Sequence, residues 1–409
     1  MANKSTTWRR VPVVDLCEVH VDCVNRTAPV VSEPTPFKMI RTTNVRNGFI
    51  DTENVRYVTE PVYKKWTRRL VPKRGDVILT REAPLGGVGK VRTDDQIFLG
   101  QRLYHFRADP KKLDADFLLY ALMADDLQGQ IRGFGSGSTV EHMRLGDIPE
   151  LQIYAPDVSE QRRIGAILSA YDELMENSQR RIRLLEAMAR ALYREWFVHF
   201  RFPGHEKHPR VTSPLGHIPQ GWEVKKLGDI AEDMRRNVPK GELEEPKPYV
   251  GLEHIPRRSL ALDAWETATE LGSNKLEFKK GEVLFGKIRP YFHKVSVAPF
   301  DGLCSADTIV IRSRRPEHYA VVVACVSSDA FVAEASATAN GAKMPRANWD
   351  VLEKFPVVIP KGKVAEKFSA LFADIIAQQQ ALIFQIQNLR RTRDLLLPRL
   401  LSGQVELKT

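Results

Sequence analysis

The chain consists of two diverged copies of one domain-sized unit, and no other feature limits its possible folds as strongly. GDVILTREAPL (75–85) aligns with GEVLFGKIRPY (281–291) at an offset of 206 residues, and 137–156 aligns with 341–360 at an offset of 204. A third match joins 36–45 to 248–255. Internal repetition of this length predicts one architecture that is built twice. In the first alignment, the matched residues are Gly75, Asp76, Val77, Arg81 and Pro84 with Gly281, Glu282, Val283, Lys287 and Pro290.

Both copies contain the same order of predicted elements. Short β-rich runs come first, GDVILT, LYHFRA and LQIYAP in one copy and GEVLFG, TIVIRS and PVVIP in the other. A helix is expected within 114–131 and again within 318–336, and a long helix begins a few residues after Pro156 and Pro360. We therefore expect an α/β (α+β) fold with a globular domain at 1–157, a long helix at 158–200, a connector and second domain at 201–361, and a long helix with a tail at 362–409.

Each long helix carries one apolar seam with a spacing of 3.5 residues. Alternate steps of four and three residues from Ile164 and from Phe368 meet apolar side chains except at Ser178, Gln379 and Arg393. This spacing is typical of the a and d positions of a coiled coil. The order globule, helix, globule, helix favours an antiparallel pair with an approximate twofold axis, and packing of each helix on its own globule is the alternative. The predicted seam is Ile164, Leu168, Tyr171, Met175, Ile182, Leu185, Leu192, Phe368, Phe372, Ile375, Leu382, Ile386, Leu389 and Leu396.

Catalytic motifs are not found. REAPLGGVGKV (81–91) resembles a phosphate-binding loop, but GxxxxGK[ST] requires glycine where Pro84 stands and Ser or Thr where Val91 stands. The matching segment of the second copy, KIRPYFHKVSV (287–297), contains no glycine, so we reject nucleotide hydrolysis. The chain also lacks [DN]PP[YF], the motif of an amino-methyltransferase, and GxGxxG, and its histidines and four cysteines do not show metal-ligand spacing. We predict no catalytic residue and no metal site.

The charge of the chain favours a polyanionic partner. Lys and Arg number 61 against 51 Asp and Glu, a net charge of +10, and neutralising phosphates releases condensed counterions. No apolar run is long enough to span a bilayer, and the polar N-terminus does not resemble a secretory signal, so we expect a cytoplasmic protein. Basic and polar residues of the globules are candidate DNA contacts: Arg41, Thr42, Thr43, Asn44, Arg46, Lys64, Arg68, Arg81, Lys90, Arg132, Ser136, Ser138, Thr139, His142, His254, Arg257, Arg258, Lys287, Arg289, Tyr291, His293, Lys294, Lys343 and Arg346.

Three segments resemble conserved regions of one family. SEQRRIGAILSAYDELMENSQRRIRLLEAMARALYREWF (159–197), SPLGHIPQGWEVKKLGDI (213–230) and EKFSALFADIIAQQQALIFQIQNLRRTRDLLLPRLLSGQVEL (366–407) are similar to the central region, second-domain entry and distal region of the specificity (S) subunits of type I restriction-modification systems. The resemblance covers essentially the whole chain. It implies two target-recognition domains, each reading one half of an asymmetric bipartite DNA target, and an antiparallel helical pair that sets the spacer.

The resemblance also implies partners. Two modification (M) subunits would bring S-adenosylmethionine and methylate adenine N6, and restriction (R) subunits would cleave DNA with ATP and magnesium, whereas this chain would bind no cofactor and catalyse no reaction. The competing interpretations are a self-contained DNA-acting enzyme with a duplicated DNA-binding fold and a coiled-coil scaffold. Outward residues of the helices are candidates for docking the M subunits, namely Gln161, Arg162, Asp172, Glu176 and Arg180.

Overall fold

In the computed structural model the chain forms two compact units. Unit 1 comprises Met1–Leu174 and Leu389–Thr409, and unit 2 comprises Met175–Asn388. The structure describes residues 8–135, 141–405 and 407. Each unit contains one globular domain and a part of each of the two long helices, α4 (Val158–Tyr193) and α9 (Lys363–Leu401).

Unit 1 is built around a four-stranded antiparallel sheet whose strand order is β2-β10-β7-β8. The central strand β7 is buried along its whole length, as its apolar run predicts. A small sheet of order β6-β3-β9 and the pairs β1-β11 and β4-β5 complete the β structure. The strands are β1 (Arg9–Pro12), β2 (Cys17–Asp22), β3 (Phe37–Ile40), β4 (Val45–Arg46), β5 (Phe49–Ile50), β6 (Arg56–Tyr57), β7 (Val77–Arg81), β8 (Leu85–Lys90), β9 (Gln96–Leu99), β10 (Leu103–Ala108) and β11 (Gln152–Ala155), and the short helices are α1 (Glu60–Trp66), α2 (Ala115–Met123) and α3 (Asp125–Gly133).

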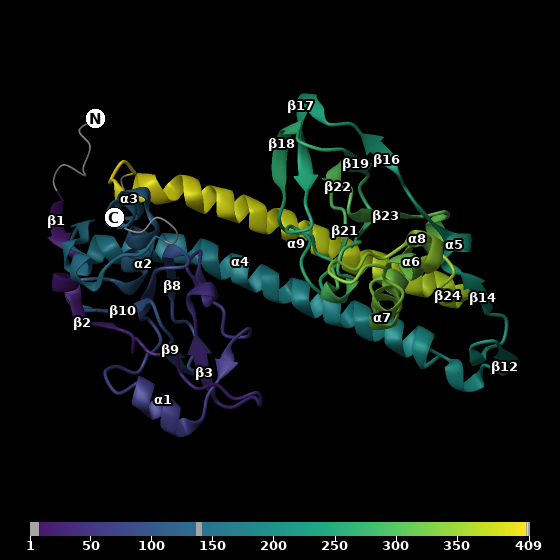
Figure 1. Cartoon of the computed structure of the whole chain (residues 1–409), viewed down its shortest axis with the longest axis horizontal. Coiled ribbons are helices and arrows are strands. Elements are labelled where there is room, and N and C mark those ends of the chain that lie inside the picture. The colour runs from purple at the N-terminus through teal and green to yellow at the C-terminus, as the bar shows by residue number, and fades with distance from the viewer. Residues whose placement is uncertain (1–7, 136–140, 406, 408–409) are drawn as a thin grey trace. The chain divides into compact units, whose positions relative to one another are not determined.

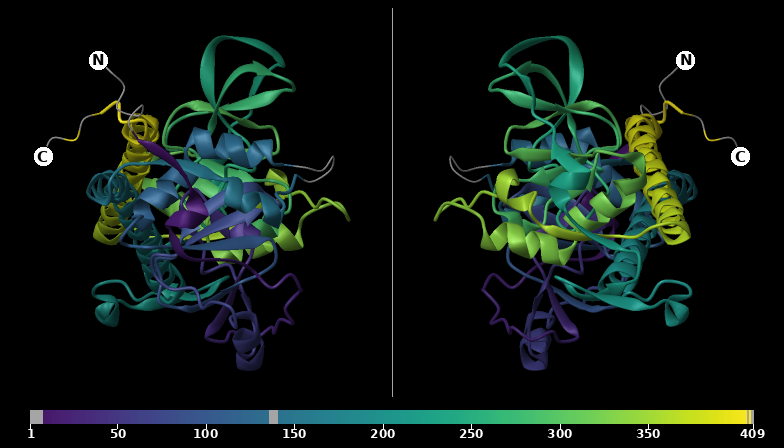
Figure 2. Two further views of the ribbon diagram at one scale, coloured as in Figure 1. Left: turned by 90° about the vertical axis from the view of Figure 1, so that its left-hand side faces the viewer. Right: turned by 90° about the vertical axis from the view of Figure 1, so that its right-hand side faces the viewer.

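Unit 2 repeats this arrangement. Its four-stranded sheet has the order β15-β23-β20-β21, and a five-stranded sheet of order β16-β19-β22-β17-β18 stands where unit 1 has three strands. Figure 2 shows β17 and β18 projecting from the rest of unit 2. The elements are β12 (Arg210–Ser213), β13 (Gly216–Pro219), β14 (Glu223–Lys226), α5 (Leu227–Ile230), β15 (Ala231–Asp233), β16 (Arg236–Val238), β17 (Gly241–Val250), β18 (Glu266–Leu271), β19 (Lys275–Phe278), β20 (Val283–Gly286), β21 (Val295–Val297), β22 (Gly302–Ser305), β23 (Thr308–Ser313), α6 (Tyr319–Val326), α7 (Asp329–Ala337), α8 (Trp349–Leu352) and β24 (Pro356–Ile359).

The strand registers of the two units correspond. Leu103 lies opposite Thr80 in the β10–β7 pair, and Thr308 lies opposite Gly286 in the β23–β20 pair. The parallel pair β3–β9 has its counterpart in the parallel pair β17–β22. The duplication predicted from sequence is therefore a duplication of strand order, direction and register.

Both expected globular helices are broken into two. In unit 1 the extended residue Ala124 separates α2 from α3, and in unit 2 Ser328 precedes α7 with extended dihedral angles. The Asp114 side chain accepts hydrogen bonds from the first amides of α2, and the Ser328 hydroxyl accepts one from Phe331 N at 3.2 Å. Helix α6 is buried at nearly every position, which places it inside the core of unit 2.

The two long helices pair antiparallel, and this confirms the predicted fold class. In unit 1, Leu400 near the end of α9 belongs to the same core cluster as Ile164 near the start of α4. In unit 2, Trp196 and Phe197, which follow α4, lie 5.8 Å and 4.6 Å from the Phe368 ring near the start of α9. Figures 1 and 2 show α4 in teal and α9 in yellow side by side. Every predicted seam residue is buried or half-buried, and the three polar seam positions are buried as well.

Most of the glycine-rich segment 81–91, whose sequence resembles a phosphate-binding loop, is a strand. Leu85–Lys90 forms β8 and pairs with β7 through a turn of three residues. A Cβ atom on Gly89 would lie 2.6 Å from Phe49 O, and one on Gly87 would lie 2.8 Å from Val45 O. These glycines therefore permit the β4–β5 hairpin to approach the strand closely.

No single helix among the described residues is both long and apolar enough to cross a bilayer. The bent pair Pro316–Val326 and Asp329–Ala337 has the necessary length and composition only when its two helices are taken together.

Candidate nucleic-acid interface

Three connections meet at the end of β7 in unit 1, where the sequence places polar and basic residues. The first follows β3, the second is the turn after β7, and the third follows α3. The Thr42 hydroxyl donates to Ala83 O at 2.8 Å, which joins the first to the second, and Glu82 forms a β-bridge with His142, which joins the second to the third. We call residues 41–48, 82–86, 134–135 and 141–143 the three-loop junction of unit 1.

Unit 2 joins the equivalent connections at the end of β20. Arg258 N donates to His293 O at 2.8 Å, and Arg289 N donates to Pro345 O at 2.8 Å. Ile288 forms a β-bridge with Arg346, which corresponds to the bridge between Glu82 and His142 in the other unit. The three-loop junction of unit 2 thus comprises 252–259, 287–294 and 338–347. The scaffold is the same in both units, but the side chains that it presents differ.

The turn of each junction contains a left-handed residue before a proline. Ala83 has φ 48° and precedes Pro84, and Arg289 has φ 50° and precedes Pro290. His293, which ends the same turn in unit 2, has φ 53°. Residues other than glycine rarely adopt this conformation, and it persists only where the surrounding structure enforces it. The left-handed residue before a proline is therefore part of the scaffold that both copies share.

A buried carboxylate fixes the start of the central strand in each unit. Asp76, directly before β7, accepts hydrogen bonds from His105 Nε2 at 2.6 Å and from Arg107 Nε at 2.8 Å. Burial by itself would raise the pKa of Asp76, but the hydrogen bonds from Arg107 and His105 outweigh it and lower the pKa to about 2. These contacts keep the carboxylate ionised and hold β7 against β10.

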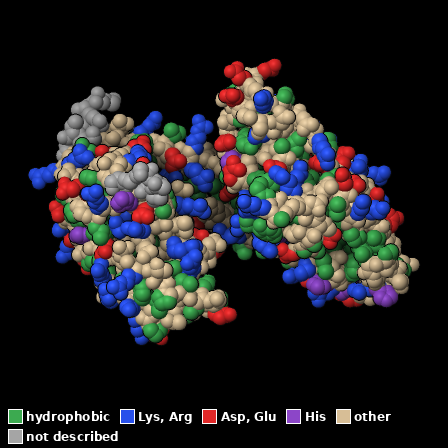
Figure 3. All heavy atoms as spheres, in the orientation of Figure 1, with side chains coloured by type: hydrophobic (Ala, Val, Ile, Leu, Met, Phe, Trp, Pro, Cys, Tyr) green, Lys and Arg blue, Asp and Glu red, His purple; other side chains and the backbone are tan. Residues whose placement is uncertain are grey.

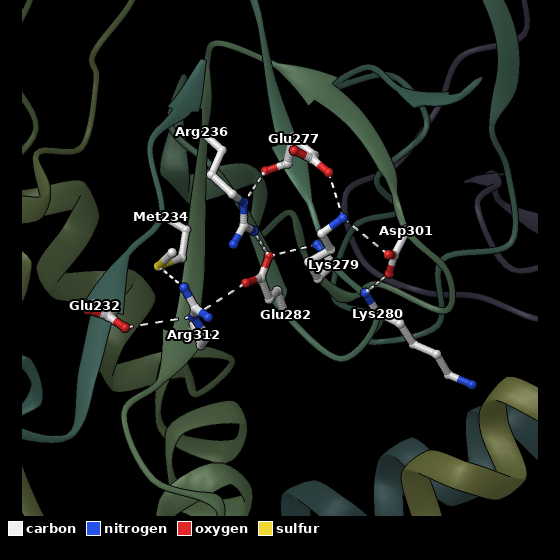
Figure 4. A network of polar contacts seen from close by, with 9 residues as sticks. All are labelled: Glu232, Met234, Arg236, Glu277, Lys279, Lys280, Glu282, Asp301 and Arg312. Atoms are coloured by element: carbon white, nitrogen blue, oxygen red, sulfur yellow. Dashed lines mark hydrogen bonds and ion pairs between the residues drawn. The ribbon is translucent and has the colours of Figure 1, made fainter. Parts of the chain in front are cut away.

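Glu282 has the corresponding role before β20. Its side chain is buried, accepts from Lys279 N at 2.7 Å and pairs with Arg236 and with Arg312, whose Nε lies 3.6 Å away. Figure 4 shows these three residues around Glu282: Arg236 lies on β16, Arg312 lies on β23, and Lys279 directly follows β19. The sequence alignment pairs Asp76 with Glu282, but nothing in the sequence indicates their partners.

The predicted DNA contacts fall into three groups by exposure. Exposed residues are Thr43, Arg46, Lys64, Arg68, Arg132, Arg257, Arg258, Tyr291, Lys343 and Arg346. Half-buried residues are Arg41, Thr42, Lys90, His142, His254, Lys287, Arg289 and Lys294. Asn44, Arg81 and His293 are buried, and Ser136, Ser138 and Thr139 lie outside the described residues.

Several predicted contacts hold the scaffold together. Arg81 donates through Nη1 to Met143 O at 2.8 Å, and the Asn44 side chain bonds Arg41 N and Asn54 O. Lys90 is paired with Asp116. Lys64 lies on α1, where it pairs with Glu60 at 2.7 Å, and Figure 1 shows α1 apart from α2 and α3. Sequence alone did not distinguish these residues from free surface cations.

Two basic side chains of the unit 2 junction, His293 and Lys294, are held by hydrogen bonds to backbone carbonyl groups. Burial lowers the pKa of His293, whose Nε2 donates to Ser327 O at 2.9 Å, and burial together with nearby Arg257 lowers the pKa of Lys294. Lys294 donates to Leu252 O, so its ammonium group is held at the base of the junction. Figure 3 shows Lys and Arg side chains on the drawn face of both units, interspersed with Asp and Glu.

Two of the expected docking residues on α4 are internal. Asp172 is fully buried and accepts hydrogen bonds from Tyr120 Oη at 2.8 Å and Arg393 Nη1 at 2.7 Å. Gln161 is also fully buried, and its side chain bonds Asp114 N at 2.9 Å. The expectation that they face outward was wrong, because globule 1 and α9 cover this side of α4 in unit 1. Arg162 and Arg180 are exposed and Glu176 is half-buried.

The described residues offer no group of three His, Cys, Asp or Glu side chains arranged to hold a metal ion. The chemistry available at the junctions is hydrogen bonding, charge and stacking, which are the interactions that recognise nucleic acid.

Comparison with known proteins points in one direction. The family described as type I restriction modification DNA specificity domain matches residues 6–187. The type I restriction enzyme MjaIX specificity subunit of Methanocaldococcus jannaschii is 26% identical over 367 residues, which cover 86% of this chain and 82% of that protein. The EcoDI specificity subunit of Escherichia coli is 27% identical over 299 residues, 66% of each protein. The crystal structure of a type I restriction-modification S subunit from M. genitalium superimposes with a TM-score of 0.58 at 16% identity and covers 98% of this chain and 97% of its own, a likeness of fold.

Proposed function

Because the chain belongs to the specificity subunits of type I restriction-modification systems, we propose that its two three-loop junctions read the two halves of an asymmetric, bipartite DNA target. As a specificity subunit it is the non-catalytic DNA-recognition component of such a system. The observation that carries the proposal is the pair of junctions, which repeat one scaffold with different side chains. Identical junctions would read a symmetric site, whereas unlike junctions read unlike half-sites.

Each junction offers both kinds of contact that specific binding requires. Arg46, Arg257 and Arg346 in the junctions, and Arg132 in the last turn of α3, are exposed and can pair with phosphates or with guanine edges. The net charge of +10 supports a salt-dependent electrostatic contribution to binding. Arg258 and Arg346 lie beside Asp329 and Asp307, so part of the positive charge is held in place by neighbouring carboxylates.

The antiparallel helices would separate the two readers and dock two M subunits, which would supply S-adenosylmethionine and the methyl transfer to adenine N6. R subunits would add ATP- and magnesium-dependent cleavage. We place this assembly in the cytoplasm. Exposed apolar residues on the helices, such as Leu184 (59% exposed), Met188 (58%) and Leu395 (56%), support a protein partner along them.

Domain exchange tests the assignment of one half-site to each globule. Residues 1–157 are replaced by the first globule of another specificity subunit, and methylated adenines are mapped across the genome with the parent and with the chimera. We expect one half of the target to change and the other half and the spacer to remain. A chimera that alters both halves, or neither half while methylation continues, contradicts the assignment. The reciprocal exchange of residues 201–361, which keeps the paired strands β14 and β24 together, is the matched control, since it must change the other half.

A further inference from the structure

An isolated apolar pair stands on the junction of unit 2. In the stretch 231–361, which the structure describes completely, the exposed large hydrophobic side chains are Tyr291, 55% exposed, and Met344, 46% exposed. They lie on two different connections, but the hydrogen bond from Arg289 N to Pro345 O joins these connections within two residues of both side chains. A soluble domain that otherwise covers its apolar groups thus presents two of them together, at the place proposed to face DNA.

Tyr291 is held rigidly. It is the middle residue of a short 3-10 turn (Pro290–Phe292) that lies between two left-handed residues, Arg289 and His293. Phe292 N donates to Arg289 O at 2.9 Å and His293 N donates to Pro290 O at 2.8 Å. The buried His293 ring fixes the far end of the turn through its bond to Ser327 O. A turn whose backbone is already fixed loses little entropy when the side chain that it carries binds.

The turn also rests on a stack of aromatic and cationic groups. The Phe292 ring lies 4.8 Å from the Tyr291 ring at 69°, and the Arg257 guanidinium covers Phe292 at 4.1 Å from its centroid. Lys287, Lys343 and Arg346 belong to the same two connections. An apolar protrusion among cations fits the duplex interior between two phosphate backbones, whereas a protein-binding patch would be broader and less charged.

We propose that Tyr291 and Met344 form an apolar wedge that enters the duplex and unstacks one base step in the half-site read by unit 2. This inference rests on the proposed function and names how one junction obtains part of its specificity. Insertion favours flexible pyrimidine–purine steps, so the wedge selects sequence through deformability in addition to base edges. Unit 1 lacks the wedge at the turn, because Leu85 stands at the position of Tyr291 and is half-buried in β8, and the position of Met344 falls outside the described residues. The proposal therefore concerns the half-site that unit 2 reads.

Fluorescence of 2-aminopurine tests the wedge. The complex of this chain with its modification subunits is titrated with duplexes that carry the methylation-mapped target and 2-aminopurine at successive positions of the unit 2 half-site. We expect the fluorescence to rise on binding at one step. Tyr291→Ala should abolish the rise and weaken binding about tenfold, the loss typical of one base stacked on an aromatic ring. Tyr291→Phe should keep both, and Val71→Ala, which truncates an exposed apolar residue of unit 1 (50% exposed), should change neither.

The outcomes separate the wedge from the function on which it rests. A rise that Tyr291→Ala leaves intact, or an equal loss with Tyr291→Phe, overturns the wedge, because the contact would then lie elsewhere or depend on the hydroxyl. Target-specific binding without a Tyr291-dependent signal overturns the wedge alone. Binding that does not distinguish the target from a scrambled duplex overturns the proposed function as well.

Discussion

Removal of Arg393 should destabilise unit 1 strongly, because this seam residue forms a buried ion pair with Asp172. The side chain of Asp172 has no exposed area, and that of Arg393 is 7% exposed, with 2.7 Å between Oδ1 and Nη1. Truncation of one partner of such a pair leaves a buried charge without its counterion, which costs about 3–5 kcal/mol. Because Tyr120 Oη at 2.8 Å and Arg92 Nη2 at 3.3 Å still donate to Asp172, we expect Arg393→Ala to cost about 3 kcal/mol, the lower end of that range.

The expected loss corresponds to a fall in Tm of about 6–12 °C for a unit of this size, measurable by calorimetry on the full chain. Arg391→Ala is the matched control, since Arg391 is exposed two residues away on the same helix and should leave Tm nearly unchanged. The double variant Asp172→Ala with Arg393→Ala should cost less than the sum of the two single variants. A fall of under about 2 °C for Arg393→Ala, or strict additivity in the double variant, would refute the buried-pair argument.

Two further predictions address the strand anchor and the helices. Because the folded-state pKa of Asp76 (about 2) lies below its ordinary value of 3.8, Asp76 stabilises the fold above about pH 4, and this contribution, about 2 kcal/mol, is lost as pH falls through 2. Over this pH window the free energy of unfolding of the wild-type chain should thus fall by about that amount more than the free energy of unfolding of Asp76→Asn. Parallel pH profiles of the two proteins would count against a stabilising role of Asp76. Insertion of four residues into both α4 and α9 should lengthen each helix by about 6 Å and widen the unread spacer by about two base pairs with both half-sites unchanged. Methylation mapping that shows altered half-sites with the original spacer would rule out the helices as the spacer.

Much of the fold was predictable because it follows from local patterns that repeat. Apolar runs such as those of β7 and β20 identify the central strands, and a 3.5-residue seam with few polar interruptions favours a partner helix. Comparison of the two copies excluded a phosphate-binding loop at 81–91, because the matching segment 287–297 contains no glycine. The glycines at 86, 87 and 89 resemble those of a phosphate-binding loop but lie in strand β8, where they leave room for the β4–β5 hairpin. The sequence does not show which segment packs against a glycine.

The site was less predictable, because its composition depends on contacts between distant segments. The candidate contacts near the junctions were chosen by residue type alone. In the folded chain the Arg81 side chain donates to Met143 O and the Asn44 side chain bonds backbone groups, so both stabilise the scaffold. The seam pattern likewise could not show that Asp172, beside the seam, would meet Arg393 in it. In unit 2 the positions equivalent to these two hold Ile376 and Ala189, both buried, so helix packing alone does not require an ion pair there. Tyr291 was a candidate contact, but its strained, anchored turn is a property of the folded chain.

The last turns of the chain complete the core of the first domain. Leu396, Leu397, Leu400 and Leu401 pack into the cluster that contains Ile164 and Leu168, yet they follow those residues by more than half of the polypeptide. At about 5–20 residues per second, a ribosome needs roughly 12–47 s to reach them after it has made the start of α4. During that interval the apolar seam at the start of α4 lacks the leucines that later cover it, so the first domain completes its core only after α9 has been made.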